Sequence, residues 1–351
     1  MGWSRVLPRQ QTNVMSLSSQ ILFTLLYADI FQYPYTFDEL IGWMPKNRWD
    51  RNAVQKQIRY LLRIKSISYK TPFYTLYGHT GNIATRVNRE RIARDKWKKA
   101  RRAANILRLI PTILFVGVTG GLSMQNADEG DDVDFFICAK KGTLWITRFF
   151  STLLLEICGI RRHPESKVVK DAICLNMFVT ENALAVLQSQ RDMYIAHEVL
   201  QMKPLWEREH AYRTFLLKNR WVSSIFPYKW KEVLRNILRH PESRNNVRGK
   251  LSEGPYFDNR SVSFDSSAFG FRMIVSLIYN FQLCCVHFLR LLEKPAKHIQ
   301  LWYMKRRRTS EVVSDTIIRF HPHDARNWIP TFLWSKSKKM HLPLDKNFFH
   351  P

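Results

Sequence analysis

The chain has 351 residues, with 55 Lys and Arg against 29 Asp and Glu and a formal net charge of +26. Because this length exceeds that of one ordinary hydrophobic core, two or three packed units are expected. The apolar fraction of 45% and the aromatic fraction of 13% exclude an intrinsically disordered protein.

Residues 1–80 are predicted to form a winged helix-turn-helix-like domain. Apolar residues recur at helical spacing, and a β-hairpin pattern surrounds Thr71-Pro72. The expected helices are at 15–31, at 36–43 and after the N-cap candidate Asp50, and the expected strands are at 66–69 and 73–77. Three short helices followed by a hairpin are the element order of a winged helix.

The third predicted helix carries Arg51, Lys56 and Arg59 on its polar side. A helix that reads a nucleic-acid groove has this character. A small domain that packs against the rest of the protein or against a partner has the same element order, so the sequence leaves both interpretations open.

Residues 81–110 are predicted to form a basic connecting helix. Lys and Arg are frequent along it, and Ile83, Trp97 and Leu107 belong to a single apolar stripe. One apolar stripe with a solvated basic face is typical of a helix that connects two domains.

Residues 111–182 are predicted to form a compact core of strands and helices. The apolar run 112–118 indicates a buried strand, and further strands are expected at 133–138 and 172–179. An amphipathic helix is expected at 142–157. This order predicts an α+β fold with a small mixed β-sheet and helices packed against it.

Residues 183–351 are predicted to form a helical C-terminal region. The helices are expected at 183–188, 192–201, 207–218, 228–238, 269–292 and 299–309. A mobile linker is expected at 241–264, a segment rich in Ser, Asn, Arg and Gly.

The segment 269–292 is apolar and about as long as a bilayer span. Polar residues such as Arg272, Gln282 and Arg290 interrupt it, and these are costly in lipid. We therefore expect a buried helix and no integral membrane insertion, with peripheral membrane attachment as a third, weaker interpretation of the protein.

An acidic cluster stands out in this basic chain. Its five carboxylates lie within seven positions: Asp128, Glu129, Asp131, Asp132 and Asp134. Because residues two apart on a strand share a face, Asp132 and Asp134 should project together from the start of the strand. Two carboxylates that close repel each other unless a cation or proton lies between them. Mg²⁺, which prefers hard oxygen ligands and substrate phosphates, is the natural ion.

A glycine turn precedes the acidic cluster. Gly120 and Gly121 follow the buried strand directly, and glycines permit positive φ and a close approach of backbone N–H groups to a phosphate. A helix beginning after them would add positive potential, and Ser123 would add a hydroxyl donor. Each element is unspecific alone, but the two in this order are much more specific.

Residues 118–137, VTGGLSMQNADEGDDVDFFI, resemble the signature of the DNA polymerase β-like nucleotidyltransferase superfamily. Gly120-Gly121 match its glycine pair, and Asp132-Val133-Asp134 match its metal-binding Asp-x-Asp. The resemblance covers about a fifth of the chain. It implies a transferase that moves a nucleoside monophosphate from a nucleoside triphosphate, expected to be ATP, to an acceptor and releases pyrophosphate. The acceptor is a small molecule, a protein or RNA.

The resemblance also implies roles for individual residues. Asp132 and Asp134 would hold two Mg²⁺ or Mn²⁺ ions, and Gly120, Gly121 and Ser123 would bind the phosphates. Many members use a third carboxylate on a neighbouring strand, and Asp171 precedes the expected third strand. It would help to deprotonate the acceptor hydroxyl. A residue that merely begins the strand explains Asp171 equally well.

The positive charge bears on partners. A field of this sign attracts nucleoside triphosphates, nucleic acid or an anionic membrane surface, without choosing among them. Cations flank the acidic cluster in sequence: Lys140, Lys141, Arg148, Arg161, Arg162, Lys167 and Lys170. The alternative function is a catalytically inactive nucleotidyltransferase fold that acts as a nucleic-acid-binding or regulatory module.

The cysteines and the N-terminus bear on location. The five cysteines have no metal-type CxxC spacing and lie mostly in apolar runs, which favours free thiols in a reducing compartment. The first residues lack the pattern of a signal peptide. We therefore expect a cytoplasmic protein.

Overall fold

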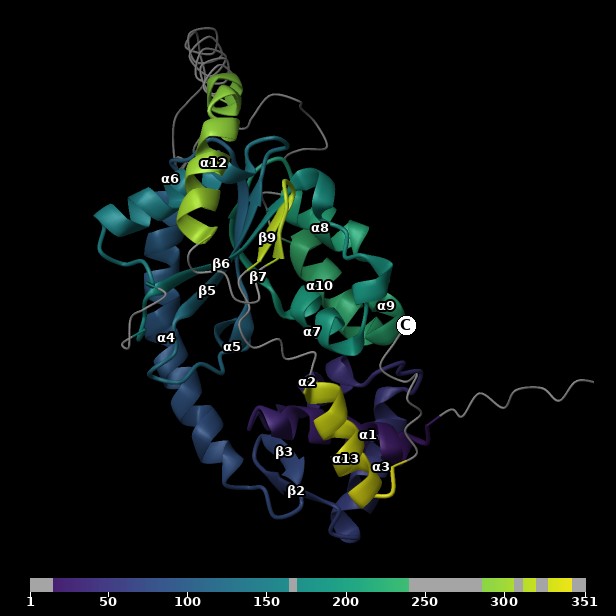
Figure 1. The fold of residues 1–351 in the computed structure, drawn as a ribbon. Coiled ribbons are helices and arrows are strands. Elements are labelled where there is room, and N and C mark those ends of the chain that lie inside the picture. The colour runs from purple at the N-terminus through teal and green to yellow at the C-terminus, as the bar shows by residue number, and fades with distance from the viewer. Residues whose placement is uncertain (1–14, 164–168, 240–285, 306–311, 320–327, 343–351) are drawn as a thin grey trace, which may run out of the picture.

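The computed structural model describes residues 15–163, 169–239, 286–305, 312–319 and 328–342. Within them, helices surround two sheets, one of three strands and one of six (Figure 1). The larger sheet is mixed: β5 and β6 run parallel, and the other neighbouring strands run antiparallel. The α+β class predicted from the sequence is confirmed.

The N-terminal elements follow the predicted order with one added strand. In chain order they are α1 (Leu17–Ile30), β1 (Tyr35–Thr36), α2 (Phe37–Trp43), α3 (Arg51–Arg63), β2 (Ile67–Lys70) and β3 (Phe73–Leu76). Thr36 and Glu39 form a capping box at the start of α2, and Asp50 caps α3 by accepting from the Ala53 N–H at 2.8 Å. The added strand, β1, pairs with β3. A strand of two residues is too short to give a recognisable sequence pattern.

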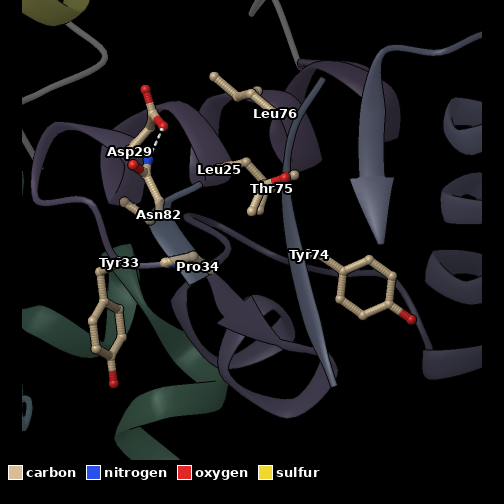
Figure 2. Close-up of a pocket in the computed structure, with 9 residues that line it drawn as sticks. Leu25, Asp29, Tyr33, Pro34, Tyr74, Thr75, Leu76 and Asn82 are labelled. Atoms are coloured by element: carbon tan, nitrogen blue, oxygen red, sulfur yellow. Dashed lines mark hydrogen bonds between the residues drawn. The ribbon is translucent and has the colours of Figure 1, made fainter. Parts of the chain in front are cut away.

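Helix α4 (Asn82–Leu107) joins these elements to the large sheet. Its start is fixed to the end of α1, because the Asn82 side chain donates to Asp29 Oδ1 at 2.9 Å (Figure 2). The cavity in Figure 2 has a volume of about 10 Å³, so it has room for about one water molecule.

The basic side of α4 is less solvated than the sequence predicts. Arg86 is buried, ion-paired with Glu39 at 2.8 Å and stacked on the Tyr33 ring. Lys96 is also buried. These two cations anchor the helix to its neighbours, whereas Lys98 remains on the exposed side.

The six-stranded sheet has the order β7-β4-β5-β6-β9-β8. The strands are β4 (Ile113–Val118), β5 (Val133–Ala139), β6 (Ile173–Thr180), β7 (Lys203–Glu207), β8 (Val312–Val313) and β9 (Ile317–Arg319). The one-turn helix α5 (Gly120–Ser123) follows β4, and α6 (Leu144–Ile157) connects the parallel strands β5 and β6.

Alternate residues of β5 face two different cores. Phe135 and Ile137 belong to the core that includes α4, α6 and α12 (Glu293–Lys305). Phe136 and Cys138 belong to the core that includes α7 (Met193–Gln201) and α8 (Ala211–Lys218). Figure 1 shows these two helix groups on opposite sides of the sheet. The two-residue period of the strand thus places Asp134, like Phe136, on the α7 side.

The C-terminal region departs from the helical prediction. Residues 203–207 form β7, so the helix expected from residue 207 begins only at Ala211. Strands β8 and β9 extend the sheet beyond β6. The helix expected at 183–188 is replaced by two 3₁₀ turns, Glu181–Ala183 and Gln188–Gln190. Strands of two to five residues have too few positions for a periodic signal, and their pairing partners are distant in sequence.

The remaining C-terminal helices are α9 (Val222–Ile225), α10 (Pro227–Arg239) and α13 (Ile329–Lys339). The linker expected at 241–264 and residues 269–285 of the expected apolar helix lie outside the described residues, whereas 286–291 are helical. Among the helices that the structure describes, none has both the length and the apolar composition needed to cross a lipid bilayer.

One buried histidine ties α7 to the N-terminal helices. The His197 ring stacks on Tyr27 at 4.2 Å and on Trp43 at 4.3 Å between ring centroids. Burial lowers the pKa of His197 to about 3, and the positive charge of Lys229 adds to this shift. His197 is therefore a neutral packing residue at ordinary pH.

Candidate functional site

Two carboxylates and a thiol lie close together at the N-terminal end of β5. Asp132 directly precedes β5, Asp134 lies within it, and the register places Cys174 of β6 beside Asp134. One ligand atom of each residue lies within 4.8 Å of the others. Asp132 and Asp134 face the same cavity, as their two-residue spacing predicts.

An arginine neutralises one of the two acids. Arg162 Nη1 donates to Asp132 Oδ2 at 2.5 Å and lies 3.7 Å from Cys174 Sγ. The Arg162 backbone N–H donates to the Ile173 carbonyl at 2.9 Å, which holds the arginine against the start of β6. Arg162 is one of the seven cations that flank the acidic cluster in the sequence, and only the tertiary structure shows that it is the one that pairs with Asp132.

Asp134 is the more deeply enclosed acid. Burial and the neighbouring charge of Asp132 raise the pKa of Asp134 to about 7. A hydrogen bond with Cys174 opposes part of this rise. Burial also raises the pKa of the Cys174 thiol, so the thiol stays protonated. Burial and this repulsion therefore favour the protonated carboxyl of Asp134 unless a cation replaces the proton.

The glycine turn lies directly against Asp134. Gly120 has φ +64°, and a Cβ at this position would lie 2.8 Å from Asp134 Oδ2. The Thr119 N–H donates to the Asp134 carbonyl at 3.1 Å and fixes the turn against β5. Only glycine combines this backbone conformation with so close an approach of the acid.

The other two predicted phosphate-binding residues support the turn from behind. A Cβ on Gly121 would lie 2.9 Å from the Asn126 carbonyl oxygen, so this glycine allows two backbone segments to touch. The buried Ser123 hydroxyl donates to the Gly120 carbonyl at 2.8 Å. Thr119 and Gly120 line the cavity beside the acids, whereas Gly121 and Ser123 are not among its lining residues.

The cavity has a volume of about 370 Å³, within the range of small-molecule sites. Its charged lining residues are Asp132, Asp134, Arg162, Glu198 and Arg319. The rest is mainly apolar, with walls from β6, from α7 and from residues 183–187. Charged groups beside a larger apolar space suit a ligand with one anionic and one less polar part.

A third acid, Glu198 of α7, lines the same cavity. Burial and the charge of Asp134 raise the pKa of Glu198 to about 7. Tyr194 and Gln201 form hydrogen bonds with its carboxyl group. Its sequence neighbour His197 points into the core instead, so the pair separates into one packing residue and one cavity residue. A lone acid on an otherwise apolar helix was the available sequence signal.

Asp171 lies apart from the other predicted site residues. It accepts from Lys96 at 3.1 Å and from Lys99 at 2.5 Å, and it is not among the residues that line the cavity. It precedes β6 and has φ +62°, whereas Cys174 and Asn176 of β6 line the cavity. An acid three residues before Cys174 does not share its face of the strand.

Lys96 holds the acidic loop in place, a role that the sequence does not indicate. Its buried ammonium donates to the Glu129 carbonyl at 3.2 Å and to the Asp131 carbonyl at 2.5 Å, in addition to Asp171. One cation from α4 thus holds both the segment that leads into Asp132 and the start of β6.

The donor set fits a hard divalent cation. Asp132 and Asp134 supply carboxylate oxygens, which Mg²⁺ and Mn²⁺ accept together with phosphate oxygens and water. The neutral thiol of Cys174 is a soft donor and would be a poor ligand for either ion. No known protein family matches this chain, and no curated protein or solved structure is significantly similar to it.

Proposed function

We propose that the protein is a metal-dependent nucleotidyltransferase that transfers a nucleoside monophosphate from a triphosphate, ATP in the first instance, to an acceptor. The observation that carries the proposal is the contact of the Gly120 turn with Asp134, beside Asp132, in the lining of a cavity of about 370 Å³. A phosphate chain and a divalent cation are the partners that such a combination of backbone and paired acids suits.

The chain's residues divide the work as follows. Asp132 and Asp134 hold the cation, which when bound withdraws charge from the phosphates. The backbone of Thr119 and Gly120, which lines the cavity, would contact the phosphate chain. Arg162, which pairs with Asp132 here, can turn to a phosphate oxygen once that carboxylate has a cation, because both groups line one cavity.

The acceptor belongs in the apolar part of the cavity. Its hydroxyl oxygen forms a bond to the α-phosphorus, the bond from that phosphorus to the bridging oxygen breaks, and pyrophosphate leaves. Glu198 lines the same cavity, close enough to Asp134 for that charge to raise its pKa, and its carboxylate form can take the proton from the hydroxyl. We assign the base role to Glu198 ahead of Asp171, which two lysines engage elsewhere.

The test measures binding and turnover separately. Titration with a non-hydrolysable ATP analogue should give binding that requires Mg²⁺ or Mn²⁺, and pyrophosphate release should be sought with each nucleoside triphosphate and with mixed small-molecule, protein and RNA acceptors. Asp132→Asn and Asp134→Asn should abolish both. Glu129→Gln, a change of an exposed acid on the same loop, is the matched control and should leave both intact. Absence of metal-dependent binding in the wild type overturns the proposal.

A second function has specific support. Cys174, which is no carboxylate, stands beside Asp134 on β6, and Arg162 already neutralises Asp132. A catalytically inactive fold that binds a nucleotide or nucleic acid as a regulatory module would have this composition. Lys56 and Arg59 are exposed on α3, as a nucleic-acid surface requires. Metal-independent binding of nucleic acid that weakens steeply with salt, without pyrophosphate release, would favour this function.

A further inference from the structure

Residues 286–291 and α12 are two helical stretches separated by a turn at Leu292, and both carry apolar side chains on two sides. One side of α12 is buried in the core that includes α6: Ala296 and Met304 are at most 6% exposed. Glu293 and Gln300 fix this side, because the Glu293 carboxylate accepts the Trp145 and Ile146 N–H groups at 2.9 Å and Gln300 donates to the Trp145 carbonyl at 2.7 Å.

The second apolar side faces outward and has no role in that core. We call it the outer stripe, and its exposed fractions are Phe288 61%, Leu291 75%, Leu292 36%, Ile299 60%, Trp302 66% and Tyr303 56%. Within 286–291 a spacing of three residues places Phe288 and Leu291 on one side, and within α12 spacings of three and four residues place Ile299, Trp302 and Tyr303 on one side. Large apolar side chains that gather on a protein's surface mark an interaction site.

Cations border the outer stripe. Arg290 and Lys294 are exposed between the stripe and the buried side. Glu293 is the one acid among residues 286–305, and its carboxylate is turned toward α6. A face of aromatic and aliphatic side chains, flanked by cations and free of acid, is the composition of a helix that lies in a membrane interface.

We propose that the outer stripe rests on an anionic lipid surface, with Trp302 and Tyr303 at the headgroup level and Arg290 and Lys294 against the lipid phosphates. Trp and Tyr favour this depth because their rings are amphipathic. A second copy of the chain is a poorer occupant, because two molecules of net charge +26 repel each other whereas an anionic bilayer attracts each of them. The attachment is peripheral and independent of the proposed catalytic function.

The experiment is co-sedimentation of the full chain with lipid vesicles. One set contains phosphatidylcholine alone, and the other has about a third of it replaced by phosphatidylglycerol. Binding to the anionic set alone is expected, weakening as salt rises from about 0.1 to about 0.5 M. Arg290→Gln with Lys294→Gln should weaken it roughly thirtyfold, about fivefold for each cation.

A pair of double variants identifies the surface. Trp302→Ser with Tyr303→Ser should weaken vesicle binding at least about tenfold. Trp49→Ser with Tyr77→Ser removes two aromatics that are 39% and 55% exposed elsewhere, and should leave binding unchanged. Equal binding by the two double variants, equal binding to both vesicle sets, or a wild-type dimer without vesicle binding would each overturn the proposal. Circular dichroism melts verify that every variant is folded.

Discussion

Replacing Asp134 with Asn should stabilise the metal-free protein at alkaline pH. The pKa of Asp134 is raised from an ordinary 3.8 to about 7, so the folded state binds a proton more tightly than the unfolded state does. Stability then falls as pH rises from 3.8 to 7 and stays level above 7. At about 1.4 kcal/mol for each pKa unit, ionisation of Asp134 destabilises the fold by up to about 4 kcal/mol at pH 8.

Asparagine has nearly the shape of the protonated acid and carries no charge. Asp134→Asn should therefore exceed the wild type in unfolding free energy by up to about 4 kcal/mol at pH 8 in a chelator, and by less than about 2 kcal/mol at pH 5. Mg²⁺ should narrow the difference at pH 8, since a bound cation stabilises only the protein that holds it.

Urea unfolding followed by tryptophan fluorescence measures these differences, at both pH values and with or without Mg²⁺. Glu129→Gln provides the control, because Glu129 is exposed and its ion pair with Lys170 lies at the surface. A variant less stable than the wild type at pH 8, or a difference that is the same at both pH values, would show that burial and repulsion do not govern Asp134. An equal effect of Mg²⁺ on wild type and variant would place the cation elsewhere.

Other substitutions test other parts of the site. Gly120→Ala should abolish metal-dependent triphosphate binding. Gly159→Ala is the control: it has the same φ of +64° but no atom within 4 Å of the added Cβ, so it should lower stability by about 1 kcal/mol and leave binding unchanged. Loss of binding in both variants would show that the contact with Asp134 is not the cause. His197→Phe should make the protein less sensitive to acid. Because the pKa of His197 is about 3 in the folded state against 6.5 in the unfolded state, the wild type loses stability as pH falls below 6.5. In urea titrations at pH 5 this loss should be about 2 kcal/mol relative to the variant. Lys96→Met should destabilise by about 1–3 kcal/mol in the same assay, because two carbonyls lose their buried donor while Asp171 keeps Lys99. Asp171→Asn should lower the melting temperature yet leave triphosphate binding per folded molecule unchanged; a loss of binding would return Asp171 to the site.

The acidic pair and the glycine turn could be found in the sequence because local rules fix them. A continuous apolar run indicates a buried strand, and side chains two residues apart share its face, so Asp132 and Asp134 were placed together without knowledge of the fold. Gly120 follows from the need for positive φ at a sharp turn. The capping residues Thr36 and Asp50 are local in the same sense.

The rest of the site depends on which distant segments meet. Cys174 becomes a neighbour of Asp134 through the parallel register of β5 and β6, and Glu198 reaches the cavity because α7 packs on that side of the sheet. Its position just before β6 makes Asp171 the predicted third acid. In the fold, Asp171 forms ion pairs with Lys96 and Lys99 of α4, which lie more than seventy residues earlier in the chain.

The sequence by itself determined the α+β class, the buried strands and the paired acids, since each depends on a periodicity or a backbone requirement within a few residues. Tertiary structure decided the short strands β7, β8 and β9, the choice of Arg162 among seven nearby cations, and the burial of Lys96 and His197. The physical reason is that register, burial and ion pairing depend on contacts between residues far apart in the chain, and a local pattern does not encode the partner.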